Sequence, residues 1–249
     1  MDIKDSPEQM LLDFFATHIF IKMSSLLYSS FAKMDSEDLF TIKNQHYIDK
    51  ALEKKCGAVL TSAHLGPSML IAFWAGKKYK TGLLRLLHNN GAATFGQRLA
   101  NRRTRELSDF IPVEYINVQG DLSRREAILS ANGLIVQTGD GASVMTKIGK
   151  LLPVPFLSQQ VCFAKGPFSL SYRTGAPIVP YFIKCGKEKF EVTIYPPVYH
   201  DECSDISKEA WIKQAMSVFA SNFEKQFFKS PGAWQLWELF EKGKLIYND

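Results

Sequence analysis

The feature that most constrains the fold is a short apolar run that ends near a histidine. Residues 58–61 (Ala-Val-Leu-Thr) have the composition of a buried strand, and His64 follows just before a turn marked by Gly66 and Pro67. An apolar segment, 69–75, comes directly after the turn. This order of strand, turn and helix places the imidazole at the carboxyl edge of a sheet, where α/β proteins usually hold their reactive groups.

His64 has two interpretations at this position. A lone histidine is most often a structural residue that is hydrogen-bonded within the protein. At an exposed strand-to-helix corner it can instead serve in catalysis. A second corner follows residues 133–138, which have the pattern of a buried strand and lead into a glycine-punctuated loop that carries Asp140.

Strands and helices alternate through the rest of the chain. Further extended segments are expected at 82–87, 113–118, 178–184 and 190–195. Helices are expected at 42–55, 68–74, 97–109, 123–131, 163–173 and 208–228. The alternation predicts an α/β fold with a mixed, largely parallel central sheet and helices on both faces.

The 249 residues contain no segment that looks like a linker, so we expect a single domain, with an N-terminal helical part at 1–55 and an α/β core at 56–240. Between residues 10 and 28, apolar side chains recur at helical spacing: Leu11, Phe14, Phe15, Ile19, Met23, Leu26 and Leu27. Asp13, His18 and Lys22 interrupt this segment, which is therefore not expected to span a bilayer. Such an amphipathic helix either packs on the core or lies against a membrane surface or a partner.

Composition limits the class of protein. With 46% hydrophobic and 12% aromatic residues, the chain can bury a large core and is not expected to be disordered. Its formal net charge of +5 is spread along the sequence, which suits acidic ligands or anionic surfaces but does not indicate nucleic acid. The four cysteines lie far apart and match no zinc-binding spacing, and no signal peptide is evident. We therefore expect no metal and a reduced, cytoplasmic location.

Two enzyme classes are disfavoured by missing motifs. The chain has no Gly-x-Ser-x-Gly elbow, which serine hydrolases use to expose their nucleophile. It also has neither a phosphate-cradling glycine loop nor a dinucleotide-binding fingerprint. Serine hydrolysis and nucleotide chemistry are therefore not expected.

Five segments, taken together and in their order, give a more specific indication. They are residues 63–66, 136–141, 152–156, 171–180 and 231–237. From about 57 to 240, the chain resembles the late acyltransferases of lipid A biosynthesis, within the lysophospholipid acyltransferase superfamily. The resemblance implies one acyltransferase-like domain that moves an acyl group from the phosphopantetheine thioester of an acyl carrier protein or coenzyme A to a hydroxyl or amine acceptor. The thioester is a co-substrate, and no further cofactor is implied.

The same resemblance assigns candidate roles to individual residues. His64 would be the general base, with Asp140 as its acid. Backbone amides of the turn at Gly66 would stabilise the tetrahedral oxyanion, and the substrate-binding positions would include Gly141. Phosphate groups of the donor or acceptor would be held by cationic side chains, for which the positions that match are Arg85, Arg102 and Arg103. Each of these arginines is equally well explained as exposed, solvated charge.

Met69 departs from the pattern of the family. The signature of the family is a histidine followed, after four residues, by an aspartate or glutamate that orients the imidazole, and this chain has Met69 there. Three explanations are open. Another acid supplies the contact, with Asp140 the leading candidate; His64 works without an acid; or the chain is a non-catalytic module that binds acyl chains or a carrier protein. The third explanation also includes the case in which the usual acid at position 69 has been replaced by methionine.

A literal match to the signature occurs elsewhere, at His200 and Asp205. It lies in a polar, acidic loop after an expected strand, and we interpret it as accidental.

The acceptor and the location are less constrained than the reaction. Late lipid A enzymes typically begin with a membrane-spanning anchor, and the interrupted segment at 10–28 does not have that character. We therefore expect a soluble small molecule or a carrier-bound intermediate as the acceptor instead of a bilayer lipid, and a lipid acceptor stays open as a further option. We expect a cytoplasmic protein, with peripheral contact to the inner face of the membrane as an option.

Overall fold

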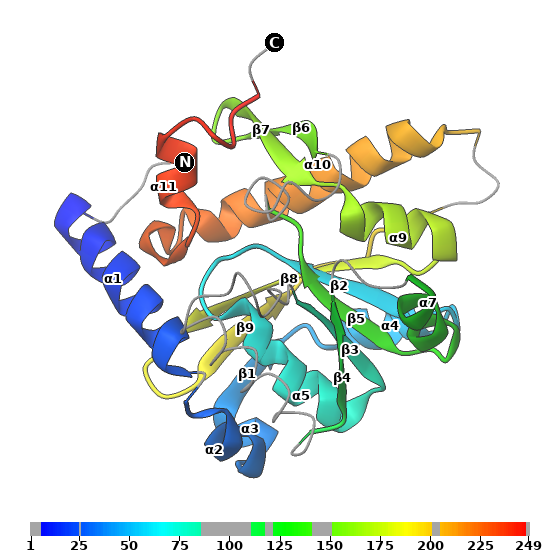
Figure 1. Cartoon of the computed structure of the whole chain (residues 1–249), viewed down its shortest axis with the longest axis horizontal. Coiled ribbons are helices and arrows are strands. Elements are labelled where there is room, and N and C mark those ends of the chain that lie inside the picture. Colours follow the sequence, from blue (N-terminus) through cyan, green and yellow to red (C-terminus); the bar gives the residue numbers. More distant parts are fainter. Residues whose placement is uncertain are drawn as a thin grey trace, which may run out of the picture.

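The computed structural model describes residues 6–24, 26–85, 111–117, 122–140, 151–200 and 205–247. Within these ranges, seven strands form the central sheet (Figure 1). In spatial order they are β1 (Phe40–Lys43), β9 (Phe190–Ile194), β8 (Ile178–Cys185), β2 (Ala58–Ser62), β5 (Leu134–Thr138), β3 (Thr81–Arg85) and β4 (Val113–Asn117). The helix expected at 97–109 lies outside the described residues.

Most neighbouring strands run parallel. The pairs β2 with β5, β2 with β8, β3 with β5 and β3 with β4 are all parallel, and so is β1 with β9. The exception is β8 with β9, which form an antiparallel pair. This mixed, largely parallel sheet confirms the predicted fold class.

The central strands are buried on both faces, as their nearly continuous apolar sequences require. Because successive side chains of a strand point to opposite faces of the sheet, neighbouring residues of one strand belong to different hydrophobic clusters. Val59, Ile135 and Ile178 pack on one face, whereas Leu60 and Val136 pack on the other. The second cluster also includes Val179.

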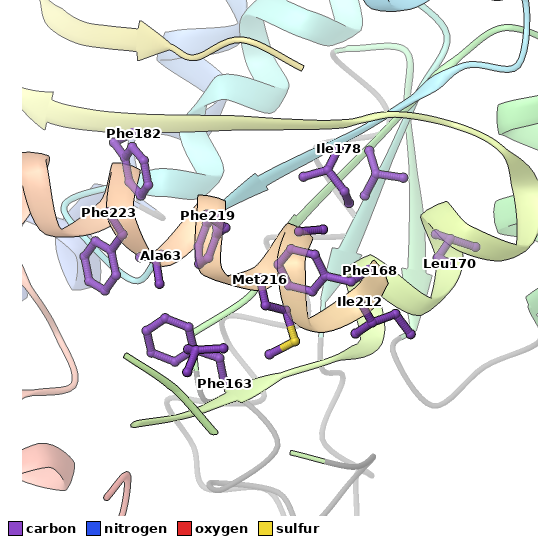
Figure 2. Packing of buried hydrophobic residues seen from close by; sticks show 14 of the residues in the cluster. Ala63, Phe163, Phe168, Leu170, Ile178, Phe182, Ile212, Met216, Phe219 and Phe223 are labelled. Atoms are coloured by element: carbon purple, nitrogen blue, oxygen red, sulfur yellow. The ribbon is translucent and has the colours of Figure 1, made fainter. Parts of the chain in front are cut away.

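Helices cover both faces, as predicted. The first face is covered by α7 (Leu122–Ser130), α9 (Gly166–Thr174) and α10 (Lys208–Phe227), together with a hairpin of β6 (Leu151–Phe156) and β7 (Gln159–Ala164). Figure 2 shows the face of α10 that carries Ile212, Met216, Phe219 and Phe223 against residues such as Phe168 and Phe182. The second face is covered by α2 (Tyr28–Lys33), α3 (Ser36–Leu39), α4 (His46–Leu52) and α5 (Ile71–Lys78).

Two expected helices begin later than the sequence suggested. The segment expected to be helical from 42 begins as β1, an edge strand paired with β9, and α4 starts only at His46. The helix expected from 163 is preceded by β7, and α9 starts at Gly166. The turn that joins β6 to β7 consists of Leu157 and Ser158, both with positive φ. Such turns normally carry Asn or Gly, so the hairpin lacks its usual sequence signal.

The N-terminal helix α1 (Pro7–Ser24) lies at the side of the molecule (Figure 1). It packs closely on the short helix η2 (Pro231–Ala233), where a Cβ added to Gly232 would overlap the carbonyl oxygen of Met10. Phe20 contacts Phe190 of β9, with ring centroids 5.5 Å apart. The opposite side of α1 leaves large apolar side chains exposed, from 52% to 64% at Leu11, Leu12, Phe15, Ile19 and Met23. Among the described helices, none is long and apolar enough to cross a membrane.

Candidate active site

The register of two parallel strands brings His64 and Asp140 together. Ser62 of β2 pairs with Thr138 of β5, and each site residue lies two positions beyond this pair. Because parallel strands end at the same edge of a sheet, the two side chains emerge side by side. His64 Nδ1 lies 2.7 Å from Asp140 Oδ1. The two strand-to-turn corners that the sequence predicts therefore lie next to each other at one edge of the sheet.

The carboxylate of Asp140 is fully buried, and both of its oxygens are hydrogen-bonded. Oδ1 accepts from His64 Nδ1, and Oδ2 accepts from the backbone N–H of His64 at 2.8 Å. The indole N–H of Trp234 is a second donor to Oδ2, at 3.0 Å. Since a carboxylate can only accept, the ring proton of His64 lies on Nδ1. In the neutral ring, Nε2 therefore carries the lone pair that can accept a proton.

The imidazole is the accessible member of the pair. The His64 side chain is 25% exposed, whereas Asp140 is 0% exposed. On the Nε2 side of the ring, the hydroxyl of Thr138 lies 3.5 Å away. Solvent therefore reaches the imidazole but not the carboxylate that is bound to it.

Asp140 changes the acid–base behaviour of His64. Burial by itself lowers the pKa of the ring, because it penalises the charged imidazolium. The negative charge of Asp140 and its hydrogen bond act in the opposite direction, and the net result is a pKa raised above the ordinary value of a histidine. The ring is therefore a stronger base than an isolated imidazole.

The C-terminal segment lies alongside the turn that carries His64. Gln235 N donates to the His64 carbonyl at 2.9 Å, and Gly66 N donates to the Ala233 carbonyl at 2.9 Å. The Gln235 side-chain amide also donates to the Gly66 carbonyl, at 3.0 Å. These bonds fix the turn, and they engage the Gly66 amide that the sequence suggested as an oxyanion donor.

Gly66 itself is required by the backbone. Its φ is +60°, and a Cβ at this position would overlap the carbonyl oxygen of Ile183. We expect Gly66→Ala to lower the free energy of unfolding by about 2 kcal/mol or more, from the left-handed backbone and the overlap together. Gly166→Ala is the matched control, because nothing lies within 4 Å of a Cβ there. Urea denaturation of the two variants tests this, and equal midpoints would contradict it.

Comparison with models of protein families gives one match for the chain. Residues 3–238 match the model described as bacterial lipid A biosynthesis acyltransferase. The match includes α1, both strands of the site and the segment that carries Trp234. The chain belongs to this family. Comparison with curated proteins found no match.

Membership of the lipid A biosynthesis acyltransferase family confirms the resemblance drawn from the five segments. It makes acyl transfer the reaction class of this chain. Among the described residues, no three His, Cys, Asp or Glu side chains lie close enough to hold a metal ion. The side chains of Asp140 and Thr138 lie next to the His64 ring, and Trp234 reaches the pair through Asp140.

The remaining candidate residues of this acyltransferase are less fully described. Arg85 is the last residue of β3, the strand next to β5, so its backbone lies at the same edge as the site. Arg102, Arg103 and Gly141 lie outside the described residues, so their binding roles stay predictions. Met69 is in the short helix η1 (Ser68–Leu70) and packs against the core on the second face of the sheet.

The second histidine motif has a different environment. The ring of His200 lies 4.4 Å from the Tyr172 ring and 5.3 Å from the Trp211 ring, measured between centroids. These aromatic neighbours belong to α9 and α10. The ring of His200 is thus packed among aromatic side chains on the first face of the sheet.

Trp234 is the residue that sequence reasoning missed. Its segment, 231–237, was recognised as one of the five that carry the resemblance, but no role followed from it. The hydrogen bond to Asp140 joins residues 94 positions apart, and no local pattern marks such a contact.

Proposed function

We propose that the chain transfers an acyl group from a phosphopantetheine thioester, on an acyl carrier protein or coenzyme A, to a hydroxyl or amine acceptor. His64 is the general base and Asp140 orients it. The observation that carries this proposal is the 2.7 Å contact between a buried carboxylate and a partly exposed imidazole. The family supplies the reaction class.

The proposed reaction is a direct transfer of the acyl group from donor to acceptor. Nε2 of His64 takes the proton of the acceptor as the acceptor oxygen or nitrogen attacks the thioester carbonyl. A tetrahedral oxyanion forms, the carbon–sulfur bond breaks, and the imidazolium returns the proton to the leaving thiolate. No covalent enzyme intermediate is required. The Leu65 amide is the oxyanion donor that we assign to the turn, because the Gly66 amide already donates to Ala233.

The proposal assigns phosphate recognition to the arginines. The backbone of Arg85 lies at the same edge of the sheet as His64. Arg102 and Arg103 are the further candidates. Guanidinium groups suit the phosphates of a pantetheine arm or of a lipid A precursor because they donate paired hydrogen bonds. Gly141 directly follows Asp140 and is proposed to line the same substrate path.

The pH dependence of the reaction follows from the raised pKa of His64. Below that pKa the ring is an imidazolium and has no lone pair with which to take a proton. We therefore expect kcat/KM to fall on the acid side, with a midpoint above the ordinary histidine value of about 6.5. Initial rates at a subsaturating donor concentration, measured from about pH 5 to about pH 9, give this pH dependence of kcat/KM. A profile that is flat through this range would contradict the assignment of the base.

A turnover experiment separates the enzyme from the alternative. The alternative, favoured by Met69 in the place of the usual acid, is a non-catalytic module that binds acyl chains or a carrier protein. The purified chain is incubated with acyl carrier protein and coenzyme A thioesters and a panel of amines, alcohols and lipid A precursors. Product that depends on His64 supports the enzyme. Binding without turnover in both the native form and His64→Ala supports the module, and turnover only in Met69→Glu marks a disabled catalyst.

The exposed side of α1 is proposed to contact the inner face of the membrane, with the protein cytoplasmic. Four observations support this location. The side chains at Leu11, Leu12, Phe15, Ile19 and Met23 form one apolar stripe. The net charge of +5 favours anionic lipids, and the lipid A family acts on lipid precursors. The helix also packs on η2, which directly precedes Trp234 of the site.

This membrane contact predicts weaker lipid binding when the stripe is made polar. We expect the double variant Phe15→Asp, Ile19→Asp to bind anionic vesicles at least about tenfold less tightly than the native chain. The reason is that each large apolar side chain loses about 1.5–3 kcal/mol of burial. Val218→Asp is the control, since Val218 is an exposed apolar residue of α10. Co-sedimentation measures the partitioning, and equal binding by all three proteins would rule out this contact.

A further inference from the structure

The second oxygen of Asp140 is bound by an indole that comes from a distant part of the chain. Trp234 Nε1 donates to Oδ2 at 3.0 Å, and both side chains are fully buried. The first oxygen is left to His64 Nδ1. The backbone N–H of His64 also donates to Oδ2, at 2.8 Å. Among the described residues, Trp234 is therefore the donor to the carboxylate that comes from outside the His64 turn.

The indole is fixed in place from two directions. Along the backbone, the turn at Leu65 forms an antiparallel bridge with Trp234. Around the ring, five aromatic side chains lie with centroids 5.6–5.8 Å away: Phe156, Phe223, Phe227, Trp237 and Phe240. A ring confined in this way cannot turn its N–H away from the carboxylate without disturbing its neighbours.

We propose that Trp234 is a positioning residue, whose indole N–H holds the Asp140 carboxylate so that its other oxygen faces the imidazole of His64. The expected effect of Trp234 on kcat and on the pH profile rests on the proposed acyl transfer. Its effect on the position of the Asp140 carboxylate does not depend on that proposal. Trp234 does not touch the reacting atoms, and it acts through Asp140.

The groups that face the pair decide what the loss of this N–H does. His64 follows the end of β2, Thr138 ends β5 and Asp140 follows it, and the C-terminal segment contributes Trp234 and Gln235. Of the described residues, Asp140 supplies the charge that raises the pKa of His64. A donor to the carboxylate shares that negative charge and so weakens its pull on the imidazolium. Removing the donor should therefore strengthen this pull.

The first experiment compares Trp234→Phe with Trp237→Phe. Both variants lose an indole N–H from the same aromatic cluster, but the N–H of Trp237 donates to the Pro231 carbonyl, at 2.6 Å, and not to the carboxylate. We expect Trp234→Phe to move the acid limb of kcat/KM upward by about 0.5–1 pH unit and to lower kcat at neutral pH about three- to tenfold, with KM unchanged. In Trp237→Phe, the acid limb of the kcat/KM profile should stay at the native pH. If the limb of Trp234→Phe also stays native, the proposal is overturned.

The second experiment needs neither turnover nor a folded Trp234 variant. The native chain has four tryptophans, so its NMR spectrum contains at most four indole N–H signals. We expect one of them to shift with pH with the same midpoint as the His64 ring signals, and to lose this shift in Asp140→Asn. If no indole signal follows the titration of His64, the proposal is overturned. Should the chain show no acyl transfer, the proposed function fails while this measurement still decides the role of Trp234.

Discussion

Replacing Asp140 by asparagine is expected to lower kcat by about 10³- to 10⁴-fold, the scale of loss when a histidine base loses its orienting carboxylate. Asparagine has nearly the same shape, but the NH2 end of its amide donates hydrogen bonds and cannot accept them. Three N–H donors converge on the present carboxylate, from the His64 ring, the His64 backbone and Trp234. An amide can satisfy only those that meet its single oxygen, so the His64 tautomer is no longer fixed.

Two further measurements identify the cause of this loss. Because the Asp140 charge raises the pKa of His64, the acid limb of any residual activity should move to lower pH in Asp140→Asn. The unsatisfied donors should also lower the free energy of unfolding by about 1–3 kcal/mol. A variant that keeps native kcat and the native limb would show that Asp140 has no part in the reaction.

Replacing His64 by alanine is expected to reduce kcat by at least about 10³-fold, because no other described group stands ready to take the proton of the acceptor. The variant keeps the backbone N–H that donates to Asp140, and Trp234 keeps its own bond to the carboxylate. The fold should therefore survive, and circular dichroism with thioester binding serves as the control. Binding that stays native while turnover disappears is the signature of a lost base.

The double variant His64→Ala, Asp140→Asn tests whether the two residues act as a unit. If Asp140 works only through the imidazole, removing it from a chain that already lacks His64 costs little more. We expect the double variant to be within about threefold of His64→Ala. Losses that multiply would mean that Asp140 acts on the substrate independently of His64.

The sequence predicted the fold class and the two corners of the site because both depend on local patterns. The buried strands at β2 and β5 are continuous apolar runs, and each is followed by a polar residue on a turn. Asp140 was named as the leading candidate acid from the family layout. What the sequence could not supply was the register, in which Ser62 pairs with Thr138, and this pairing brings the two side chains within 2.7 Å.

The misplaced and missed features share a physical cause. The hairpin of β6 and β7 turns on Leu157 and Ser158, whose positive φ is stabilised by tertiary contacts such as the bond from Leu157 N to Glu224, at 2.8 Å. Trp234 reaches Asp140 only through long-range packing. Neither contact leaves a trace in neighbouring residues, so local patterns do not reveal them.

Taking the acid from a neighbouring strand changes what the site depends on. A carboxylate at position 69 would lie in the short helix η1, which closely follows His64 in the sequence. In contrast, His64 and Asp140 are 76 positions apart and meet only when β2 and β5 are paired in register. A fragment ending before residue 120 and one beginning after it would each carry half of the couple. Under the proposed mechanism, catalytic activity would therefore require the assembled sheet, and Met69 at the usual place of the acid packs against the hydrophobic core instead.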